Sequence, residues 1–362
     1  MSSTTLRWLG TLTALVLVPV AARAEVTRTL RAQIPGAASR PVAVENLLGT
    51  TRVTVGTADA LVVVATVHAE NDALASSVRL DELRGDGGVA TLRIRYPAIS
   101  RVLRYPRRDH EHRWDGLVLF GNGNVERYDG ARYRVSSHRG TLLYADVEVQ
   151  VPARVADATF LETVGELDAD GLEGKLSFRV ASADLRLDRL NGDVEVTGTS
   201  GDTRASRIRG TWRSDFSSGD SEMERFDGSS ATFHTSSGDI AVRGIASERL
   251  SITTSSGDAR VRDADVRELQ TDASSGDLSF ETAGTRLARV LVRSSSGDVH
   301  LALAPEAPFQ AEADQSSGEM RVRFDDGERR YRRGDLVAFR RGTAGADIRV
   351  TTSSGDFTID PR

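Results

Sequence analysis

The chain has no cysteine among its 362 residues, which excludes a disulfide framework and thiolate chemistry. Aromatic residues make up only 6%, and lysine occurs once, at Lys175. A net charge of −5 argues against a nucleic-acid partner, for which a basic domain is expected. Beyond the first 24 residues, no apolar run reaches the roughly 20 residues of a membrane-spanning helix. Stability must therefore come from a packed core.

The first 24 residues have the features of a secretory signal peptide. Arg7 supplies the charged region, Trp8 to Val20 is apolar, and Ala22-Arg23-Ala24 fits the small-x-small cleavage pattern. The alternative is a transmembrane anchor, for which the apolar stretch is short. We expect cleavage after Ala24 and a periplasmic, secreted or cell-envelope protein without an integral membrane segment.

The chain does contain a repeat. Between Gly165 and Gly355, a small residue followed directly by Asp or Glu recurs at eleven sites spaced 16 to 21 residues apart, and seven of these sites read Ser-Ser-Gly-Asp or Ser-Ser-Gly-Glu. A constant period near 19 residues marks a repeat protein. The small residues are Gly165, Ala183, Gly201, Gly219, Gly238, Gly257, Gly276, Gly297, Gly318, Gly334 and Gly355.

Apolar and polar residues alternate on both sides of these turns, as in Ile240 and Val242 after Gly238. Such alternation indicates strands with one buried face, and glycine supplies the positive φ that a tight turn needs. A two-strand unit buries its apolar face only when it stacks on copies of itself. The sequence therefore predicts an all-β, single-stranded β-helix or β-solenoid with about 19 residues per coil. Small residues at Gly174, Gly192 and Gly210 predict a second turn in each coil.

We divide the chain into four parts. Residues 1–24 are the signal peptide, and residues 25–96 form an N-terminal β region that contains either the first coils or a cap. Residues 97–140 are an insertion rich in arginine and aromatic residues. Residues 141–362 are the regular β-solenoid.

The Val-x-Val-x-x-x-x-Gly pattern at 42–49, the strand from Val147 to Pro152 and the serial Ser-Ser-Gly-Asp turns resemble a bacterial family of β-strand-repeat proteins. Its members are known as "putative adhesins", and their domain has no known function. The resemblance implies a right-handed β-helix in an exported or envelope protein with no established catalytic residues. Some relatives are associated with envelope-stress signalling.

Stacked coils would align the turn carboxylates in one column. Neighbouring carboxylates about 4.8 Å apart repel each other by roughly 0.9 kcal/mol in bulk water. Turn amides, water and neighbouring arginines would offset this repulsion; the alternative is Ca²⁺, which favours clustered carboxylates. The candidate metal ligands are Asp220, Asp239, Asp258, Asp277 and Asp298. No other cofactor is expected.

Residues 96–144, the insertion with its flanks, hold five of the six tyrosines among many arginines, a combination that suits stacking on sugars and pairing with anionic groups. The alternative is that its aromatic residues pack the segment against the solenoid as a cap. The candidate binding residues are Tyr105, Arg107, Arg108, Trp114, Tyr128 and Tyr133.

A second arginine cluster spans 329–341 and includes Arg333-Gly334-Asp335, an integrin-recognition tripeptide. We interpret Gly334-Asp335 as one more turn of the array and the arginines as a solvated face, with anionic lipid or polysaccharide as the alternative.

We expect a non-catalytic protein that presents a surface to an envelope or extracellular polysaccharide or protein. The alternatives are a carbohydrate-active β-helix lyase or hydrolase and an envelope-stress-associated interaction module. Catalysis is disfavoured because a glycosidase needs two carboxylates in different environments, whereas the turn carboxylates are all alike.

Overall fold

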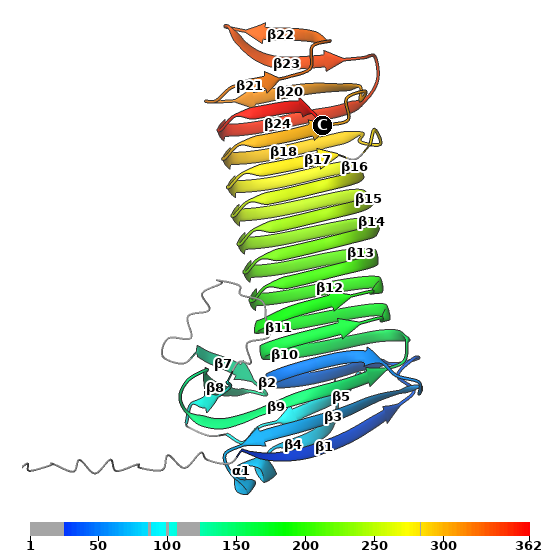
Figure 1. Ribbon diagram of the computed structural model, residues 1–362, viewed down its shortest axis with the longest axis vertical. Coiled ribbons are helices and arrows are strands. Elements are labelled where there is room, and N and C mark those ends of the chain that lie inside the picture. Colours follow the sequence, from blue (N-terminus) through cyan, green and yellow to red (C-terminus); the bar gives the residue numbers. More distant parts are fainter. Residues whose placement is uncertain (1–24, 86–87, 99–100, 107–123, 283) are drawn as a thin grey trace, which may run out of the picture.

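The computed structural model describes residues 25–85, 88–98, 101–106, 124–282 and 284–362. These residues form a long stack of β-coils with an N-terminal region at one end and a small hairpin at the other (Figure 1). The prediction of an all-β solenoid is confirmed. Within the described ranges, no helix is long and apolar enough to cross a membrane.

The N-terminal region contains one helix, α1 (Asp72–Ser77), and the first strands. They are β1 (Val26–Pro35), β2 (Pro41–Val55), β3 (Ala60–Ala69), β4 (Arg79–Arg84), β5 (Ala90–Arg95), β6 (Leu103–Arg104), β7 (Asn124–Tyr128), β8 (Ala131–Ser136) and β9 (Thr141–Val151).

The body is built from strands that mostly continue around a corner. They are β10 (Arg154–Asp170), β11 (Glu173–Asp188), β12 (Asn191–Ser200), β13 (Thr203–Ser218), β14 (Ser221–Ser237), β15 (Ile240–Ser256), β16 (Ala259–Ser275), β17 (Leu278–Thr282), β18 (Arg289–Ser296) and β19 (Val299–Leu303). The last are β20 (Phe309–Gln315), β21 (Met320–Val322), β22 (Glu328–Arg332), β23 (Asp335–Arg341), β24 (Ala346–Ser354) and β25 (Phe357–Pro361).

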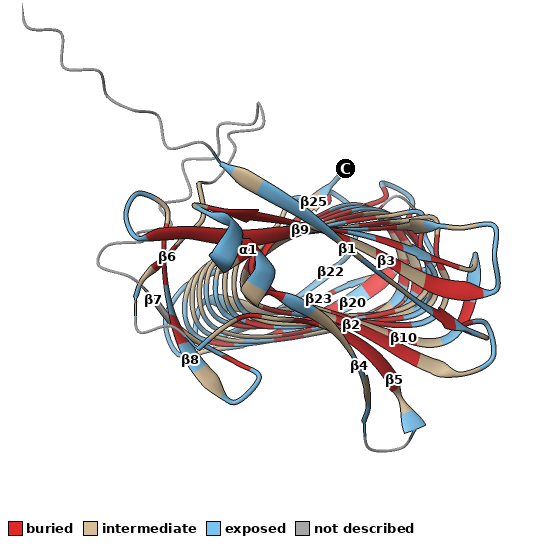
Figure 2. Cartoon of the chain, turned by 90° about the horizontal axis from the view of Figure 1, so that it is seen from below, coloured by how far each residue is buried: buried red, intermediate tan, exposed pale blue. Residues whose placement is uncertain are grey.

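In each coil, the apolar residues of the alternating pattern point inward and are buried. In β15, Leu250 and Ile252 are fully buried, whereas Arg249 between the corner and Leu250 is exposed. Parallel pairing places Leu250 beside Leu269 of the next coil, so equivalent positions stack. Figure 2 looks along the rod from the N-terminal end and shows the coils superposed around one interior.

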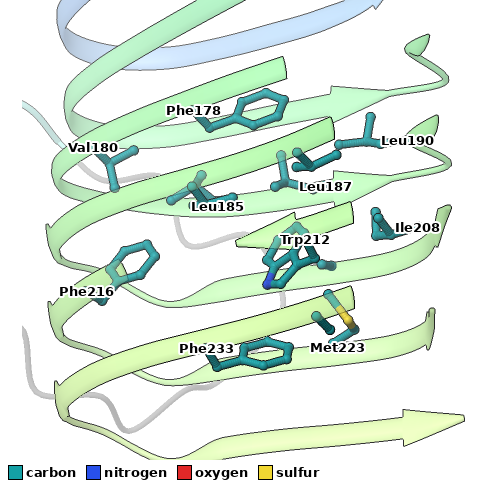
Figure 3. Close-up of a cluster of buried hydrophobic side chains, with 14 of the residues drawn as sticks. Phe178, Val180, Leu185, Leu187, Leu190, Ile208, Trp212, Phe216, Met223 and Phe233 are labelled. Carbon is teal, nitrogen blue, oxygen red and sulfur yellow. The ribbon is translucent and has the colours of Figure 1, made fainter. Parts of the chain in front are cut away.

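Large side chains fill this interior. Trp212 and Phe233 come from adjacent coils, with ring centroids 6.2 Å apart, and both are at least 98% buried (Figure 3). Phe160 and Phe178 stack in the same way at 5.6 Å. Burial of one such side chain is worth roughly 1.5–3 kcal/mol, so each coil is stabilised mainly by its neighbours.

The main turns form one column along the rod. Gly238 has φ +131°, and a Cβ atom there would lie 2.2 Å from the carbonyl oxygen of Gly219 in the coil before. Glycine is therefore required by backbone conformation and by close approach of the next coil. The column extends beyond the predicted array, because Gly165 stacks on Gly49 and Gly49 on Ala145.

The second turn is confirmed, and a third corner was not predicted. Gly174, Gly192, Gly210 and Gly228 pair with one another across successive coils. At the third corner, one residue in each of several coils has a positive φ, and only two of these residues are glycine. Its members are Gly171, Arg189, Arg207, Arg225, Gly244 and Asp263.

The order of the last coils differs from the order of the sequence. β24 pairs with β18 on one side and with β20 on the other, and β25 likewise lies between β19 and β21. The coil of Gly355 is therefore inserted between those of Gly297 and Gly318. The assignment of Gly334-Asp335 to the array was wrong, since these residues form the tip of the β22–β23 hairpin.

The N-terminal region is both a coil and a cap. β2 pairs in parallel with β10 and continues the column, whereas β1, β3 and β9 pair antiparallel below it. β23 pairs antiparallel with β20 at the other end. Antiparallel strands thus cover edges that would otherwise pair with another chain.

Candidate functional site

The turn carboxylates form a continuous hydrogen-bonded ladder. Oδ1 of Asp220 accepts from the backbone amide of Asp239 at 2.8 Å, and Oδ1 of Asp239 accepts from the amide of Asp258 at the same distance. The series runs without a break from Asp184 to Asp298, then to Asp356 and finally to the amide of Glu319. Each carboxylate therefore receives an N–H bond that offsets the repulsion between neighbours.

The second carboxylate oxygen of most rungs has no hydrogen-bond partner among the described side chains, although Arg260 reaches Asp258 at 2.7 Å and Arg321 reaches Asp356 at 2.7 Å. No three acidic or histidine side chains in the described ranges converge to hold a metal ion. Calcium binding at Asp220, Asp239, Asp258, Asp277 and Asp298 stays a prediction.

The predicted aromatic binding residues separate into two groups. Arg107, Arg108 and Trp114 lie outside the described residues. Tyr128 and Tyr133 are 5% and 4% exposed. The Tyr128 hydroxyl donates to the carbonyls of Ile94 at 2.8 Å and Glu45 at 3.0 Å, which fastens β7 to β5 and β2. This geometry favours the packing alternative for the two tyrosines.

Tyr105 is half-buried. Its ring contacts Tyr144 edge-on at 5.2 Å, and its hydroxyl lies 3.4 Å from Thr50 Oγ1. Burial raises the pKa of Tyr105 above its usual range. The neutral phenol thus forms part of the junction between β2 and the segment that follows β5.

A buried polar network that the sequence did not indicate lies beside these tyrosines. Glu162 is fully buried and accepts from Thr51 Oγ1 at 2.5 Å and from Asn46 Nδ2 at 3.0 Å. Asn46 in turn accepts from the Tyr96 hydroxyl at 3.1 Å. Burial raises the pKa of Glu162 well above its usual range. The network joins β2, β10 and the strand end after β5.

A signal for Glu162 was present in the register. It pairs with Asn46 on one side and with Val180 on the other, and Val180 is followed by Gly198 and Phe216 in the same slot. A carboxyl group in a slot that later coils fill with apolar residues indicates a special contact. This contact becomes recognisable only when the coil repeat is extended back to β2, which lies before the predicted array.

His68 lies between two carboxylates near the N-terminal end of the described chain. Nδ1 contacts Glu25, Nε2 lies 3.3 Å from Asp146 Oδ2, and the ring stacks on Tyr144 at 4.5 Å. Burial of the ring opposes protonation, but the hydrogen bonds and charges of Asp146 and Glu25 outweigh it and raise the pKa of His68. This arrangement binds the first described residue, Glu25, to β3 and β9.

The comparison with solved structures gave matches at low identity and low TM-score. A "putative lipid binding protein" from Parabacteroides distasonis is 12% identical over 92% of this chain and 96% of that chain, with a TM-score of 0.41. A "putative adhesin" from Parabacteroides merdae is 12% identical over 76% and 92%, with a TM-score of 0.37. A "putative cell adhesion protein" from Clostridium sporogenes is 7% identical over 93% and 100%, with a TM-score of 0.21.

These scores are too low to support an inference about function. A search of curated protein sequences found no match. The regular part of the array gave the one sequence-level assignment: residues 210–360 match the family model Toastrack DUF4097, a domain of unknown function.

Proposed function

We propose that this chain is an exported, non-catalytic β-solenoid that holds a binding surface toward an envelope or extracellular partner, such as a polysaccharide or protein. The observation that carries the proposal is the ladder. Between Asp184 and Asp298, six successive bonds use the same carboxylate oxygen, Oδ1, to accept from the backbone amide of the aspartate in the next coil. The turn carboxylates thus hold successive coils in alignment.

The first alternative, a carbohydrate-active β-helix enzyme, requires two carboxyl groups whose environments drive their pKa values apart. Glu162 has such a shifted pKa, but it is fully buried beneath Thr51 and Asn46 and has no route to a polymer. An envelope-stress-associated interaction module remains the second alternative, and in that case the partner is a protein.

Export and binding are tested together. Mass spectrometry of the purified protein should find Glu25 at the N-terminus, in agreement with cleavage after Ala24. The mature chain should retain members of a glycan array, and it should release no reducing or unsaturated ends from the retained polysaccharides. Turnover of any of them would establish the enzyme alternative, and an array without binding would favour a protein partner.

A further inference from the structure

We propose that the C-terminal hairpin β22–β23, with the groove beneath it, binds a carboxylated polysaccharide chain; this rests on the proposed binding function and names its site. The hairpin lies beyond the last coil, at the end of the rod opposite the N-terminal region (Figure 1). β23 pairs with β20, while β22 pairs with β23 alone among the described strands. All five residues of β22 are exposed.

Charge is concentrated at this tip. From Glu328 to Arg341 there are six arginines and two acidic residues, a net charge of +4 in a chain whose total is −5. The rest of the chain therefore carries a net charge of −9, and the hairpin is a local basic end. Such a field attracts an anionic polymer to the tip and away from the ladder.

Three of the six arginines hold the hairpin in place. Arg341 pairs with Asp326 at 2.8 Å and lies over the Phe324 ring. Arg329 donates to the Phe324 carbonyl at 2.8 Å and lies over Phe339. Arg330 pairs with Glu312 of β20 at 2.8 Å.

The other three pair with no carboxylate in the part of the chain that the structure describes. Arg332, Arg333 and Arg340 are exposed, and Arg340 donates only to the carbonyl of Gly342 at 3.3 Å among the described residues. Tyr331, beside Arg332, is 59% exposed, the most exposed large apolar side chain described. Guanidinium groups without a carboxylate partner, beside an open aromatic ring, suit the carboxylate and the flat face of a uronic acid.

An open groove of about 420 Å³ runs between the hairpin and the outer face of β20 and β24. Arg330, Arg340 and Arg349 line it together with Glu312, Glu328 and Asp347. Sugar hydroxyls donate to carboxylates and accept from arginine, so a wall of both charges fits a glycan. The groove is concave and can receive a single polymer chain, whereas a membrane presents a flat surface, which favours the polysaccharide.

Edge protection is a competing explanation, since charged residues keep an open edge strand from pairing with another chain. That role predicts self-association when the charges are removed and no effect on ligands. Edge protection also does not explain why Tyr331 is exposed or why a groove lies beside the hairpin.

The test compares two triple variants of the full mature chain. Arg332→Ser, Arg333→Ser and Arg340→Ser remove three charges from the tip. Arg209→Ser, Arg213→Ser and Arg262→Ser remove three exposed charges from the solenoid. Binding to polygalacturonate and alginate is measured at low and high salt, with fully methyl-esterified polygalacturonate as the neutral probe and phosphatidylglycerol vesicles as the lipid probe.

We expect the wild-type chain to bind both acidic polymers and neither other probe. The tip variant should lose at least tenfold in affinity and keep the oligomeric state of the wild-type chain, whereas the affinity of the solenoid variant should stay within about twofold. Tyr331→Ala should weaken binding without altering its salt dependence. Intact folding of each variant is checked by its unfolding midpoint.

Several results would overturn the assignment. Equal losses in both triple variants would show a general charge effect, and binding of vesicles in place of polymer would assign the tip to membranes. If the wild-type chain binds other glycans but not these two polymers, or if the tip variant binds them normally, the proposed binding function stands and the hairpin site is wrong. No binding to any glycan would overturn the hairpin site and would leave a protein as the partner under the proposed function.

Discussion

The middle of the solenoid and the N-terminal junction achieve stability in different ways. Between Thr203 and Ser275, every coil repeats the same apolar slots, glycine turn and ladder bond. At the junction of β2 with β10, the slot of Val180 and Phe216 instead holds Asn46 and Glu162, bonded to each other. Repetition lets any coil stack on the next, whereas the polar pair specifies where the stack begins.

This difference gives the two regions different sensitivities. A repeat tolerates the loss of one polar bond, because its core is shared with two neighbours. It cannot tolerate a change that separates two coils. The junction is sensitive to protonation, because a buried carboxyl group is stable only in its neutral form or with full hydrogen bonding.

The largest expected effect comes from separating two coils. Gly238→Ala should lower the free energy of unfolding by about 4 kcal/mol, since it adds a Cβ atom 2.2 Å from a carbonyl oxygen at a strained φ. The matched control is Gly334→Ala at the hairpin tip, where φ is +102° but nothing lies within 4 Å. Its loss should be about 1–2 kcal/mol. Equal losses in urea unfolding would show that the close approach of the coils contributes nothing.

The N-terminal junction is tested most selectively through the pH dependence that Glu162 gives to its stability. Because the pKa of Glu162 is raised in the folded protein, its contribution to stability is complete below the unfolded pKa, near 4.3, and is lost as pH rises toward the folded value. The loss is about 1.4 kcal/mol per pH unit in that window. Glu162→Gln removes the titration.

Urea unfolding of the wild-type chain and Glu162→Gln at pH 5 and pH 8 measures this effect. We expect the variant to gain stability relative to the wild-type chain as pH rises. His68 titrates in both chains and cancels from the comparison. A difference between the two chains that is the same at both pH values would contradict a raised pKa for Glu162.

A single ladder bond should matter less. Asp239→Ala removes the acceptor of the Asp258 amide, but it also relieves repulsion from Asp220 and Asp258. We expect a loss of about 1 kcal/mol. Asp227→Ala, an exposed carboxylate outside the ladder, should change stability by less than about 0.5 kcal/mol. A larger loss at Asp227 would mean that the ladder bonds are not what matters.

Calcium would sharpen the same comparison. Thermal unfolding with Ca²⁺ and with a chelator should give the same midpoint if backbone amides satisfy the ladder. A midpoint that rises with Ca²⁺ concentration would show that the native state binds the ion, and Asp239→Ala should then reduce the rise.

The smallest effect is expected from the insertion. Replacing residues 107–123 with a short glycine-serine linker removes Arg107, Arg108 and Trp114 but keeps the buried Tyr128 and Tyr133. Stability should change by less than about 0.5 kcal/mol. Glycan binding then decides the remaining prediction: unchanged retention would remove these three residues from the binding surface, and lost retention would place it there.

The sequence predicts those parts of the fold where one residue type has no substitute. Glycine marks the two turns at which successive backbones approach closely, so both columns could be read. The third corner carries Arg189, Arg207 and Arg225 at positive φ, and arginine is not a signal for that conformation. The inserted coil was missed because Gly334-Asp335 imitates a rung at nearly the right spacing.

The candidate site was less readable than the fold. A tyrosine among arginines looks the same in sequence whether its ring is open, like Tyr331, or buried, like Tyr128. Its hydroxyl finds backbone carbonyls from strands that are distant in sequence, such as Glu45 for Tyr128. Such contacts depend on how the N-terminal strands fold back on one another, and the sequence of these strands has no repeat from which that arrangement could be predicted.

The central claim is that equivalent positions stack in register, with the Gly355 coil between those of Gly297 and Gly318. Because the chain has no cysteine, engineered pairs can test it without background. Leu291 and Arg349 are partners in adjacent strands, and Arg349 separates Leu291 from Glu312. Under mild oxidation, Leu291→Cys with Arg349→Cys should form an intramolecular disulfide, whereas Leu291→Cys with Glu312→Cys should not. The reverse pattern would show that the coils stack in sequence order and would contradict the account.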